Sequence, residues 1–379
     1  MYAIALDYTP AWEQRAGIGR YVRELTAALA SEDQTNAFRL FVAGASSADL
    51  PKPPAPHISW KPTPITPRWL ARLWHRARLP LPVELFTGRI NLFHATDFVL
   101  PPTLHKTQTL LTVHDLSFVR VPQAANPQLK AYLDMVVPRS VSRADHILAD
   151  SAATKRDLLD LYRTPDDKVT VLYSGVDRHY RRIDDPALLA AARVKYGLTD
   201  IKYVLSVGTV QPRKNYARVI EALQVLRARG HDLHYAIAGE SGWLEDEFQR
   251  ALDRTGMRPF VHLLGYADDE DLPALYSEAR MLVMASLYEG FGFPVLEAMA
   301  CGTPVITSRI SSLPEVAGEA ALLIDPYDVD ALANAMSMLD NDSTLRARLA
   351  NAGIKQSAQF TWERSASQLR SIYENMLQS

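Results

Sequence analysis

The sequence contains a single cysteine, Cys301, and no uninterrupted apolar run of 18 residues. One cysteine excludes an internal disulfide framework and suits a reducing compartment. The absence of a long apolar run removes any candidate transmembrane helix, and residues 1–10 lack the basic and apolar segments of a secretory signal. We therefore expect a cytoplasmic protein that neither is exported nor spans a membrane.

Net charge is also small. The 41 Lys and Arg residues nearly balance the 43 Asp and Glu residues, which gives a formal charge of −2. No global field draws such a chain to nucleic acid or to an anionic membrane, so nucleic acid is not an expected partner and membrane attraction needs a local patch. The 47% apolar and 22% charged residues are the balance of a soluble globular protein.

The length of 379 residues favours two domains. Short β-rich runs alternate with longer amphipathic segments, which is typical of parallel sheets covered by helices. The polar stretch Ser174–Pro186 falls between two such series and reads as a linker. We predict an α/β fold of two Rossmann-like domains facing each other across a cleft, residues 1–178 and 179–360, followed by a helix over 361–379 that can return to the first domain. The expected strands are 2–6, 38–43, 91–95, 109–113, 146–149 and 169–173, then 203–207, 233–238, 261–264, 281–285, 304–307 and 321–324.

The first chemical motif is RAGIGRYVREL, in which Gly17 and Gly19 precede a helix that follows the first strand. Glycines let backbone N–H groups approach a ligand closely, and a helix N-terminus favours an anion. The same turn also serves simple packing of a helix on a sheet, so both interpretations stay open.

The second motif, VGTVQPRKN, ends a strand at Gly208 and places Arg213 and Lys214 before a helix that starts near Asn215. Two cations there oppose the helix dipole, which suggests a bound anion such as a diphosphate. Solvated loop charges are the alternative.

The third motif, YEGFGFPVLEAMACGTPV, separates Glu289 from Glu297 by seven residues. We expect Glu289 after a strand, a loop of backbone amides next, and Glu297 about one turn into a helix that starts near Pro294. Amides can donate to sugar hydroxyls and phosphate, and a carboxylate can accept from a vicinal diol such as a ribose.

Together these segments resemble the family 4 retaining glycosyltransferases of the GT-B fold. The resemblance covers nearly the whole chain, because GIGRY, TVHD, ILADSAATKRDL, YSGVD, VGTVQPRKN, LLGYADDEDLPALY, YEGFGFPVLEAMACGTPVI and SSLPEVAG occur in the family's order. The sequence is most similar to bacterial mannosyl- and rhamnosyltransferases of polysaccharide and O-antigen assembly.

The resemblance implies a role for each matching residue. His114, in TVHD, lies close to the reacting centre, and many family members carry Arg where this chain has Thr209. The implied catalytic residues are His114 and Glu289. The implied donor-binding residues are Gly17 and Gly19 beside the diphosphate, Arg213 and Lys214 against its charge, Glu289 with the amides of Gly290, Phe291, Gly292 and Phe293 at the sugar, and Glu297 at the ribose.

The implied reaction moves a hexose, with GDP-mannose as the first expected donor, to a hydroxyl of a glycan or lipid-linked acceptor. It retains the anomeric configuration and needs neither a metal nor a cofactor beyond the nucleotide sugar. Glu289 would orient the sugar without forming a covalent intermediate. A nucleotide-sugar epimerase, a phosphorylase and an inactive nucleotide-sugar-binding protein remain alternatives.

One further segment, PRWLARLWHRARLPLP over residues 67–82, reads as an amphipathic helix with Trp69 and Trp74 in its apolar stripe and arginines beside it. Such a helix either binds an anionic membrane peripherally or packs on its own domain. His94 and Asp97, near the end of another strand, either belong to loop structure or face the acceptor.

Overall fold

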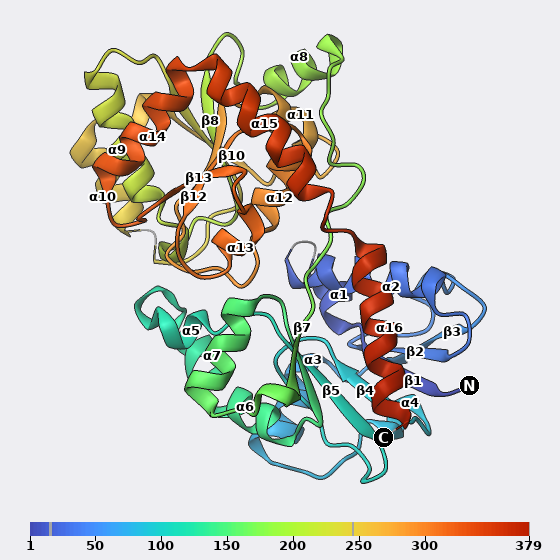
Figure 1. Cartoon of the computed structure of the whole chain (residues 1–379). Coiled ribbons are helices and arrows are strands. Elements are labelled where there is room, and N and C mark those ends of the chain that lie inside the picture. Colours follow the sequence, from blue (N-terminus) through green and yellow to red (C-terminus); the bar gives the residue numbers. More distant parts are fainter. Residues whose placement is uncertain (15–16, 245, 379) are drawn as a thin grey trace. The chain divides into compact units, whose positions relative to one another are not determined.

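The computed structural model describes residues 1–14, 17–244 and 246–378. The chain forms two compact units (Figure 1). The first comprises Met1–Leu116, Ala131–Gly175 and Thr361–Ser379, and the second comprises Ser117–Lys130 and Val176–Phe360.

The first unit is built on a 7-stranded sheet in the order β3-β2-β1-β4-β5-β6-β7, and each pair of neighbours is parallel. The predicted strands are confirmed to within two residues, but β3 was not predicted. Its sequence, ISWKPT, contains Pro62 and only one aliphatic side chain. The strand forms an edge of the sheet, where a missing N–H is tolerated. The strands are β1 Ala3–Asp7, β2 Ala37–Ala43, β3 Ile58–Thr63, β4 Leu92–Ala95, β5 Gln108–Val113, β6 His146–Ala149 and β7 Val169–Val171.

Helices connect these strands. They are α1 Thr9–Glu13, α2 Ile18–Glu32, α3 Pro67–Ala71, α4 Glu84–Thr87, α6 Pro127–Arg143 and α7 Ala152–Tyr162, with a 3₁₀ turn at Asp166–Lys168. The first turn of α6, up to Lys130, belongs to the second unit.

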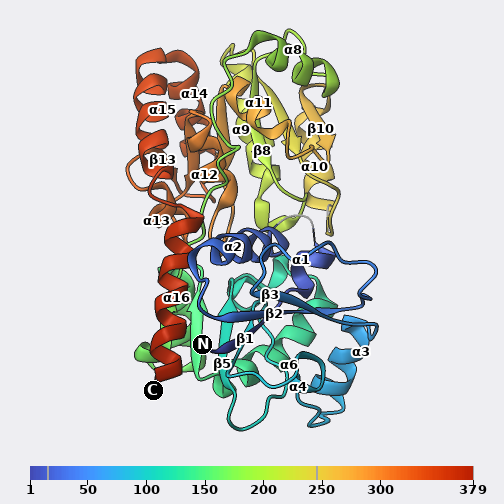
Figure 2. The same cartoon turned by 90° about the vertical axis from the view of Figure 1, so that its right-hand side faces the viewer.

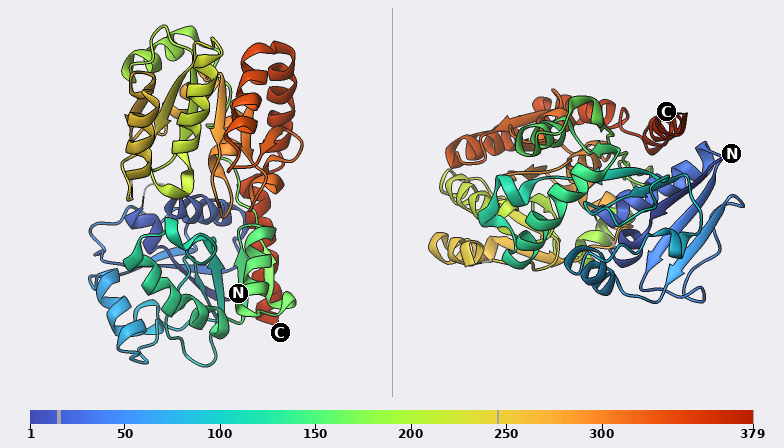
Figure 3. Two further views of the ribbon diagram at one scale, coloured as in Figure 1. Left: turned by 90° about the vertical axis from the view of Figure 1, so that its left-hand side faces the viewer. Right: turned by 90° about the horizontal axis from the view of Figure 1, so that it is seen from below.

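The last helix, α16 Trp362–Gln378, belongs to this first unit, and Figures 2 and 3 show it in red alongside the other elements of the unit. It packs against α2. The Tyr373 hydroxyl lies 2.8 Å from Nδ1 of the fully buried His94, whose Nε2 lies 2.8 Å from Thr112 Oγ1. Burial lowers the pKa of His94 to about 3, so this ring is a neutral part of the core. Its position within β4 and its two partners give it a structural role.

The helix predicted over residues 67–82 is shorter than expected. Helix α3 continues as a π-helical turn, Arg72–Arg76, and ends before Arg78, whose φ is +53°. Pro80 and Pro82 explain the early end, since the residue before a proline avoids the helical region. Trp74 packs on Phe41 and Phe86, whereas Trp69 remains 55% exposed.

The second unit holds a 6-stranded parallel sheet in the order β10-β9-β8-β11-β12-β13, and all six predicted strands are confirmed. Successive side chains of β8 enter opposite faces: Val204 joins a core with α9 and α14, and Leu205 joins one with α11 and α12. Helices therefore cover both faces, as a parallel sheet requires. The strands are β8 Tyr203–Val207, β9 His234–Ala238, β10 Val261–Gly265, β11 Met281–Met284, β12 Val305–Ser308 and β13 Ala321–Ile324.

The remaining helices lie in this unit. They are α5 Ser117–Arg120, α8 Pro186–Lys195, α9 Tyr216–Ala228, α10 Asp246–Thr255, α11 Leu272–Glu278, α12 Phe293–Ala300, α13 Leu313–Ala317, α14 Val329–Asn341 and α15 Ser343–Ser357, with 3₁₀ turns at Pro122–Ala124, Pro212–Lys214 and Arg258–Phe260. Among the described residues, none of the helices combines the length and apolar content needed to cross a bilayer.

Candidate active site

Glu289 lies at the centre of a buried ion cluster in the loop between β11 and α12. Its side chain accepts from Lys214 Nζ at 2.8 Å through Oε1 and from Arg213 through Oε2. Arg213 also donates to the carbonyl of Tyr288 at 2.7 Å. Burial alone would favour the neutral acid, but the two cations outweigh it and lower the pKa of Glu289 to about 2. The carboxylate is therefore ionised at any physiological pH.

The two cations are held by the turn between β8 and α9. Gly208 has φ of +137°, and a Cβ there would lie 3.1 Å from Cε of Lys214, so a glycine leaves room for the lysine chain. Asn215 adopts the left-handed conformation and its amide donates to the carbonyls of Ala285 and Pro326, at 2.8 Å each. Asn215 thus ties the turn to the ends of β11 and β13. From the sequence we predicted only that a helix starts near Asn215. The two hydrogen bonds of its side-chain amide were not predicted.

The side chains of two serines hydrogen-bond to the backbone of the loop that begins at Glu289. Ser312 Oγ lies 2.9 Å from the carbonyl oxygen of Glu289 and 2.6 Å from that of Phe291, and Ser311 Oγ accepts from the Glu289 N–H at 3.0 Å. A Cβ at Gly292, where φ is +126°, would come within 2.9 Å of the Leu313 side chain.

The loop after Glu289 contains two buried glycines, Gly290 and Gly292, whose backbone N–H groups are potential donors. Within the described part of the chain, no hydrogen bond occupies the N–H of Gly290 or of Gly292. Phe293 begins α12, so these donors lie at the N-terminal end of an eight-residue helix, where the partial positive charge of the helix favours an anion.

Glu297 lies in α12 and is 3% exposed. Tyr276, from α11, donates its hydroxyl to Glu297 Oε2 at 2.6 Å, and this tyrosine is fully buried. The motif LLGYADDEDLPALY contains Tyr276, but nothing in its spacing indicated a partner in another helix.

His114 follows β5 in the first unit and is 6% exposed. Its Nδ1 lies 2.7 Å from Asp150 Oδ2 and its Nε2 lies 2.9 Å from the carbonyl oxygen of Thr96. Burial favours the neutral ring, but the charge and hydrogen bond of Asp150 outweigh it and raise the pKa of His114 to about 9. Because a carbonyl can only accept and Asp150 is the nearest counter-charge, both ring nitrogens carry protons and His114 is an imidazolium at neutral pH.

Gly17 and Gly19 also lie in the first unit, at the N-terminus of α2. Gly17 has φ of +58°, with nothing near the position of a Cβ, whereas a Cβ on Gly19 would lie 2.0 Å from the carbonyl oxygen of Gln14. Close packing therefore requires glycine at position 19 whatever else the turn does. Arg15 and Ala16, from the same motif, lie outside the described residues.

The second unit thus brings Arg213, Lys214 and Glu289 together. Their charges sum to one net positive charge beside the N-termini of α9 and α12. Such an environment suits a ligand with more than one negative charge. Across residues 1–14, 17–244 and 246–378, no group of three or more His, Cys, Asp or Glu side chains is placed to hold a metal ion.

Comparison with known proteins agrees with this geometry. Residues 188–356 match the family described as "Glycosyl transferases group 1", and residues 15–180 match "Glycosyltransferase Family 4". The O-antigen chain mannosyltransferase B of Escherichia coli is 33% identical over 373 residues, which is 94% of this chain and 96% of that protein. The chain belongs to glycosyltransferase family 4. It is a hexosyltransferase related to O-antigen mannosyltransferases.

Solved structures show the same fold. A sucrose-phosphate synthase from Thermosynechococcus elongatus superposes with a TM-score of 0.76 at 23% identity, covering 99% of both chains. The Anabaena protein HepE, solved with UDP and glucose, gives 0.74 at 18% identity over 99% of this chain and 100% of its own. The family 4 glycosyltransferase described here therefore has the GT-B fold, with two Rossmann-like domains.

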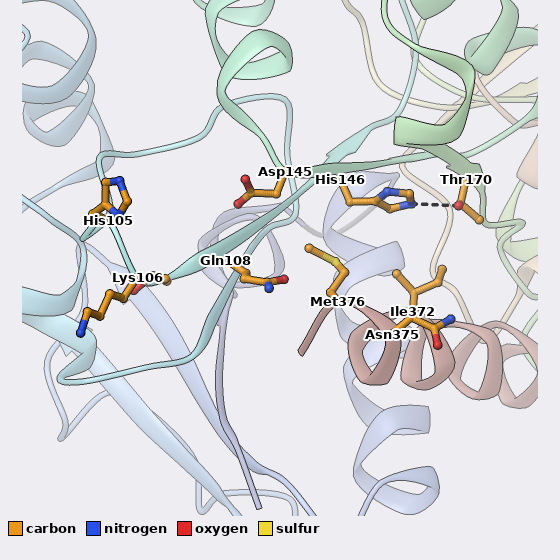
Figure 4. Close-up of a pocket in the computed structure, with 10 residues that line it drawn as sticks. His105, Lys106, Gln108, Asp145, His146, Thr170, Ile372, Asn375 and Met376 are labelled. Atoms are coloured by element: carbon orange, nitrogen blue, oxygen red, sulfur yellow. Dashed lines mark hydrogen bonds between the residues drawn. The ribbon is translucent and has the colours of Figure 1, made fainter. Parts of the chain in front are cut away.

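A cavity of about 560 Å³ lies elsewhere, at the amino ends of β5 and β6 and against α16 (Figure 4). Gln108 and His146, which begin these strands, line it together with Asn375 and Met376 of the last helix. His114 follows the opposite, carboxyl end of β5, six residues further along. The cavity therefore lies at the opposite end of β5 from His114.

Proposed function

We propose that the enzyme transfers a hexose from a nucleoside-diphosphate sugar to an acceptor hydroxyl, with retention of the anomeric configuration and without a metal. The observation that carries this proposal is the buried cluster of Glu289 with Arg213 and Lys214. The Glu289 carboxylate forms ion pairs with both Arg213 and Lys214. A diphosphate that binds these two cations takes the place of that carboxylate.

In this mechanism the diphosphate pairs with Arg213 and Lys214 and accepts from the amides that begin α12. The carboxylate of Glu289, released from one or both cations, then accepts from a hydroxyl of the donor sugar. Glu297 accepts from the ribose hydroxyls. Donors that are already in position stabilise the negative charge on the departing diphosphate. Such preorganised stabilisation is the largest source of rate acceleration in many enzymes.

His114 contributes a fixed positive charge in this proposal. An imidazolium whose two protons are already donated to Asp150 and to the Thr96 carbonyl is unsuited to act as a general base. We assign it to the donor-sugar side of the reacting centre, with Gly17 and Gly19 beside the diphosphate. The departing phosphate oxygen then accepts the proton of the acceptor hydroxyl.

Mannose is the proposed sugar, and GDP-mannose the first donor to test. Support comes from the Escherichia coli relative, which is named as a mannosyltransferase and matches this chain over nearly its whole length. We propose a glycan or a lipid-linked glycan as acceptor. Asp97, after β4, has a buried Oδ1 without a partner among the described residues, and we assign it to an acceptor hydroxyl.

We further propose that the enzyme works in the cytoplasm and contacts anionic membranes peripherally. Trp69 is 55% exposed, and the Arg72 guanidinium lies 4.7 Å from the centre of its ring. Leu85 and Leu104, in the same unit, are also at least half exposed. Apolar side chains beside arginines suit an interfacial contact, and each cation near an anionic surface contributes about 1 kcal/mol.

The transfer proposal is tested by incubating the enzyme with GDP-mannose, with and without a panel of mannose-containing acceptors. We expect nucleoside diphosphate to be released only when an acceptor is present, together with an α-linked product, because the mannose of GDP-mannose is α-linked and retention keeps that configuration. A β-linked product would refute retention. Sugar isomerisation without acceptor would instead identify an epimerase, and a requirement for inorganic phosphate would identify a phosphorylase. Binding without turnover on every acceptor would leave a nucleotide-sugar-binding protein.

The membrane proposal is tested by co-sedimentation with vesicles that contain anionic lipid, at low and high salt. A variant with Arg68, Arg72, Arg76 and Arg78 changed to Gln should lose most of the salt-sensitive binding. Equal and salt-independent partitioning of the two proteins would refute the contact.

A further inference from the structure

Tyr276, in α11, donates a hydrogen bond to Glu297, in α12. Its hydroxyl lies 2.6 Å from Glu297 Oε2, and both side chains are buried. Burial, together with the neighbouring charge of Glu297, raises the pKa of Tyr276 well above its usual value, so the hydroxyl keeps its proton and remains a donor. The direction of the bond is thereby fixed: tyrosine donates and the carboxylate accepts.

The position of Tyr276 is itself fixed by its surroundings. Its carbonyl oxygen accepts from Thr303 Oγ1 at 2.6 Å, and its ring packs edge-on against Tyr180, with centroids 6.1 Å apart. The preceding residue, Leu275, is anchored through its carbonyl by the hydroxyl of Tyr203 at 2.7 Å. The phenol therefore has little freedom to follow a carboxylate that rotates.

A glutamate has three side-chain torsions, and the terminal one is broad and poorly defined by local sterics. A carboxylate that must accept from a vicinal diol needs its plane held in one orientation, because both hydrogen bonds depend on it. A buried donor at 2.6 Å on one oxygen removes that freedom. The free-energy cost of ordering the Glu297 carboxylate is then part of folding, and it does not reduce the affinity for the ligand.

We infer that Tyr276 is a positioning residue for nucleotide recognition: it sets the orientation in which Glu297 meets the ribose hydroxyls of the donor. This inference rests on the proposed assignment of Glu297 to the ribose. It predicts that Tyr276 contributes to affinity only through Glu297, and only for nucleotides that carry ribose hydroxyls.

The test compares GDP with 2′,3′-dideoxy-GDP by isothermal titration calorimetry, with the UDP and ADP pairs in parallel because the base is not assigned. In Tyr276→Phe we expect the Kd for the ribose nucleotide to rise about tenfold, the effect of weakening one hydrogen bond to a charged group. The Kd for the dideoxy nucleotide should change less than about twofold. Equal weakening of both nucleotides, or of neither, would overturn the inference.

Tyr203→Phe provides a matched control. It removes another buried tyrosine hydroxyl from the same core, one that donates to a backbone carbonyl and not to Glu297. It should lower thermal stability to a similar degree and leave the ratio of the two dissociation constants unchanged. If this control alters the ratio as much as Tyr276→Phe does, the effect is general loosening of the core and the inference fails.

A second measurement tests whether Tyr276 acts through Glu297. In the Glu297→Ala background, adding Tyr276→Phe should leave the Kd for GDP unchanged, whereas additive losses would show that the tyrosine acts independently and would overturn the inference. Failure of the wild-type enzyme to bind any of the three ribose nucleotides would have a different meaning. It would reject the proposed donor site itself.

Discussion

Replacing Glu289 by Gln separates the stabilising ion pairs that the structure shows for this residue from the role in turnover that we propose for it. The folded protein lowers the pKa of Glu289 from 4.5 to about 2. At 1.36 kcal/mol per pKa unit this corresponds to about 3 kcal/mol of stabilisation, which lies in the range for a broken buried pair. Because the folded pKa is lowered, the stabilisation is complete above pH 4.5 and is lost as the pH falls towards 2.

We therefore expect Glu289→Gln to lower the free energy of unfolding by about 3 kcal/mol at pH 7. For a unit of this size the melting temperature should fall by about 6 to 12 °C in calorimetry. The difference from wild type should shrink as the pH is lowered below 4.5. Glu278→Gln is the control, since Glu278 pairs with Arg193 while both side chains are about a quarter exposed, and its loss should be under about 1 kcal/mol.

Glu289→Gln should bind GDP at least as tightly as wild type, because the diphosphate no longer competes with an internal carboxylate for Arg213 and Lys214. Turnover should fall by about 10²-fold or more, as is typical when a group that contacts the reacting substrate is removed. Two results would refute the reasoning. One is a stability loss below 1 kcal/mol that does not vary with pH, and the other is GDP affinity that falls together with turnover.

Further predictions concern the neighbouring groups. Lys214→Ala should weaken GDP binding by about 1.5 to 3 kcal/mol, the worth of a hydrogen bond to a charged group, and unchanged affinity for GDP, UDP and ADP would show that Lys214 is not a diphosphate ligand. Activity should persist in EDTA, since the cations assigned to the diphosphate are side chains; a complete loss that added metal reverses would contradict this. The pKa of His114 is raised to about 9 from 6.5, so its contribution to stability is complete below pH 6.5 and is lost as the pH rises through 9. Urea unfolding from pH 6 to 10 should show this loss in wild type and not in His114→Gln, and parallel curves would refute it.

The sequence predicted the strands well because buried parallel strands read as short apolar runs with few alternatives. The exceptions have local causes. Strand β3 is an edge strand with a proline and only one aliphatic side chain, and the helix from Pro67 ends early because of the prolines that follow it. Both depend on contacts or chain geometry that an apolar periodicity does not record.

The candidate site was predicted less completely. Two motifs and the family resemblance predicted Arg213, Lys214 and Glu289 as separate ligands of one donor. They contained no sign that these side chains pair with one another before any donor binds. The bracing residues Asn215 and Tyr276 were missed for a related reason. Their partners lie 70 and 21 residues away along the chain, and single-sequence patterns carry no information about such distances in space.

The placement of α16 has a consequence for biosynthesis. A ribosome releases the strands of the first unit early, yet the unit is completed only by residues 361–378, which are translated after the whole second unit. Until Tyr373 emerges, His94 lacks the partner that it has in the core, and the face of α2 that α16 covers stays open. At a synthesis rate of about 5 to 20 residues per second, residues 361–378 take about 1 to 4 seconds to add, and the second unit has that interval in which to fold first. The amino-terminal half of this enzyme is thus expected to be the last to reach its native state.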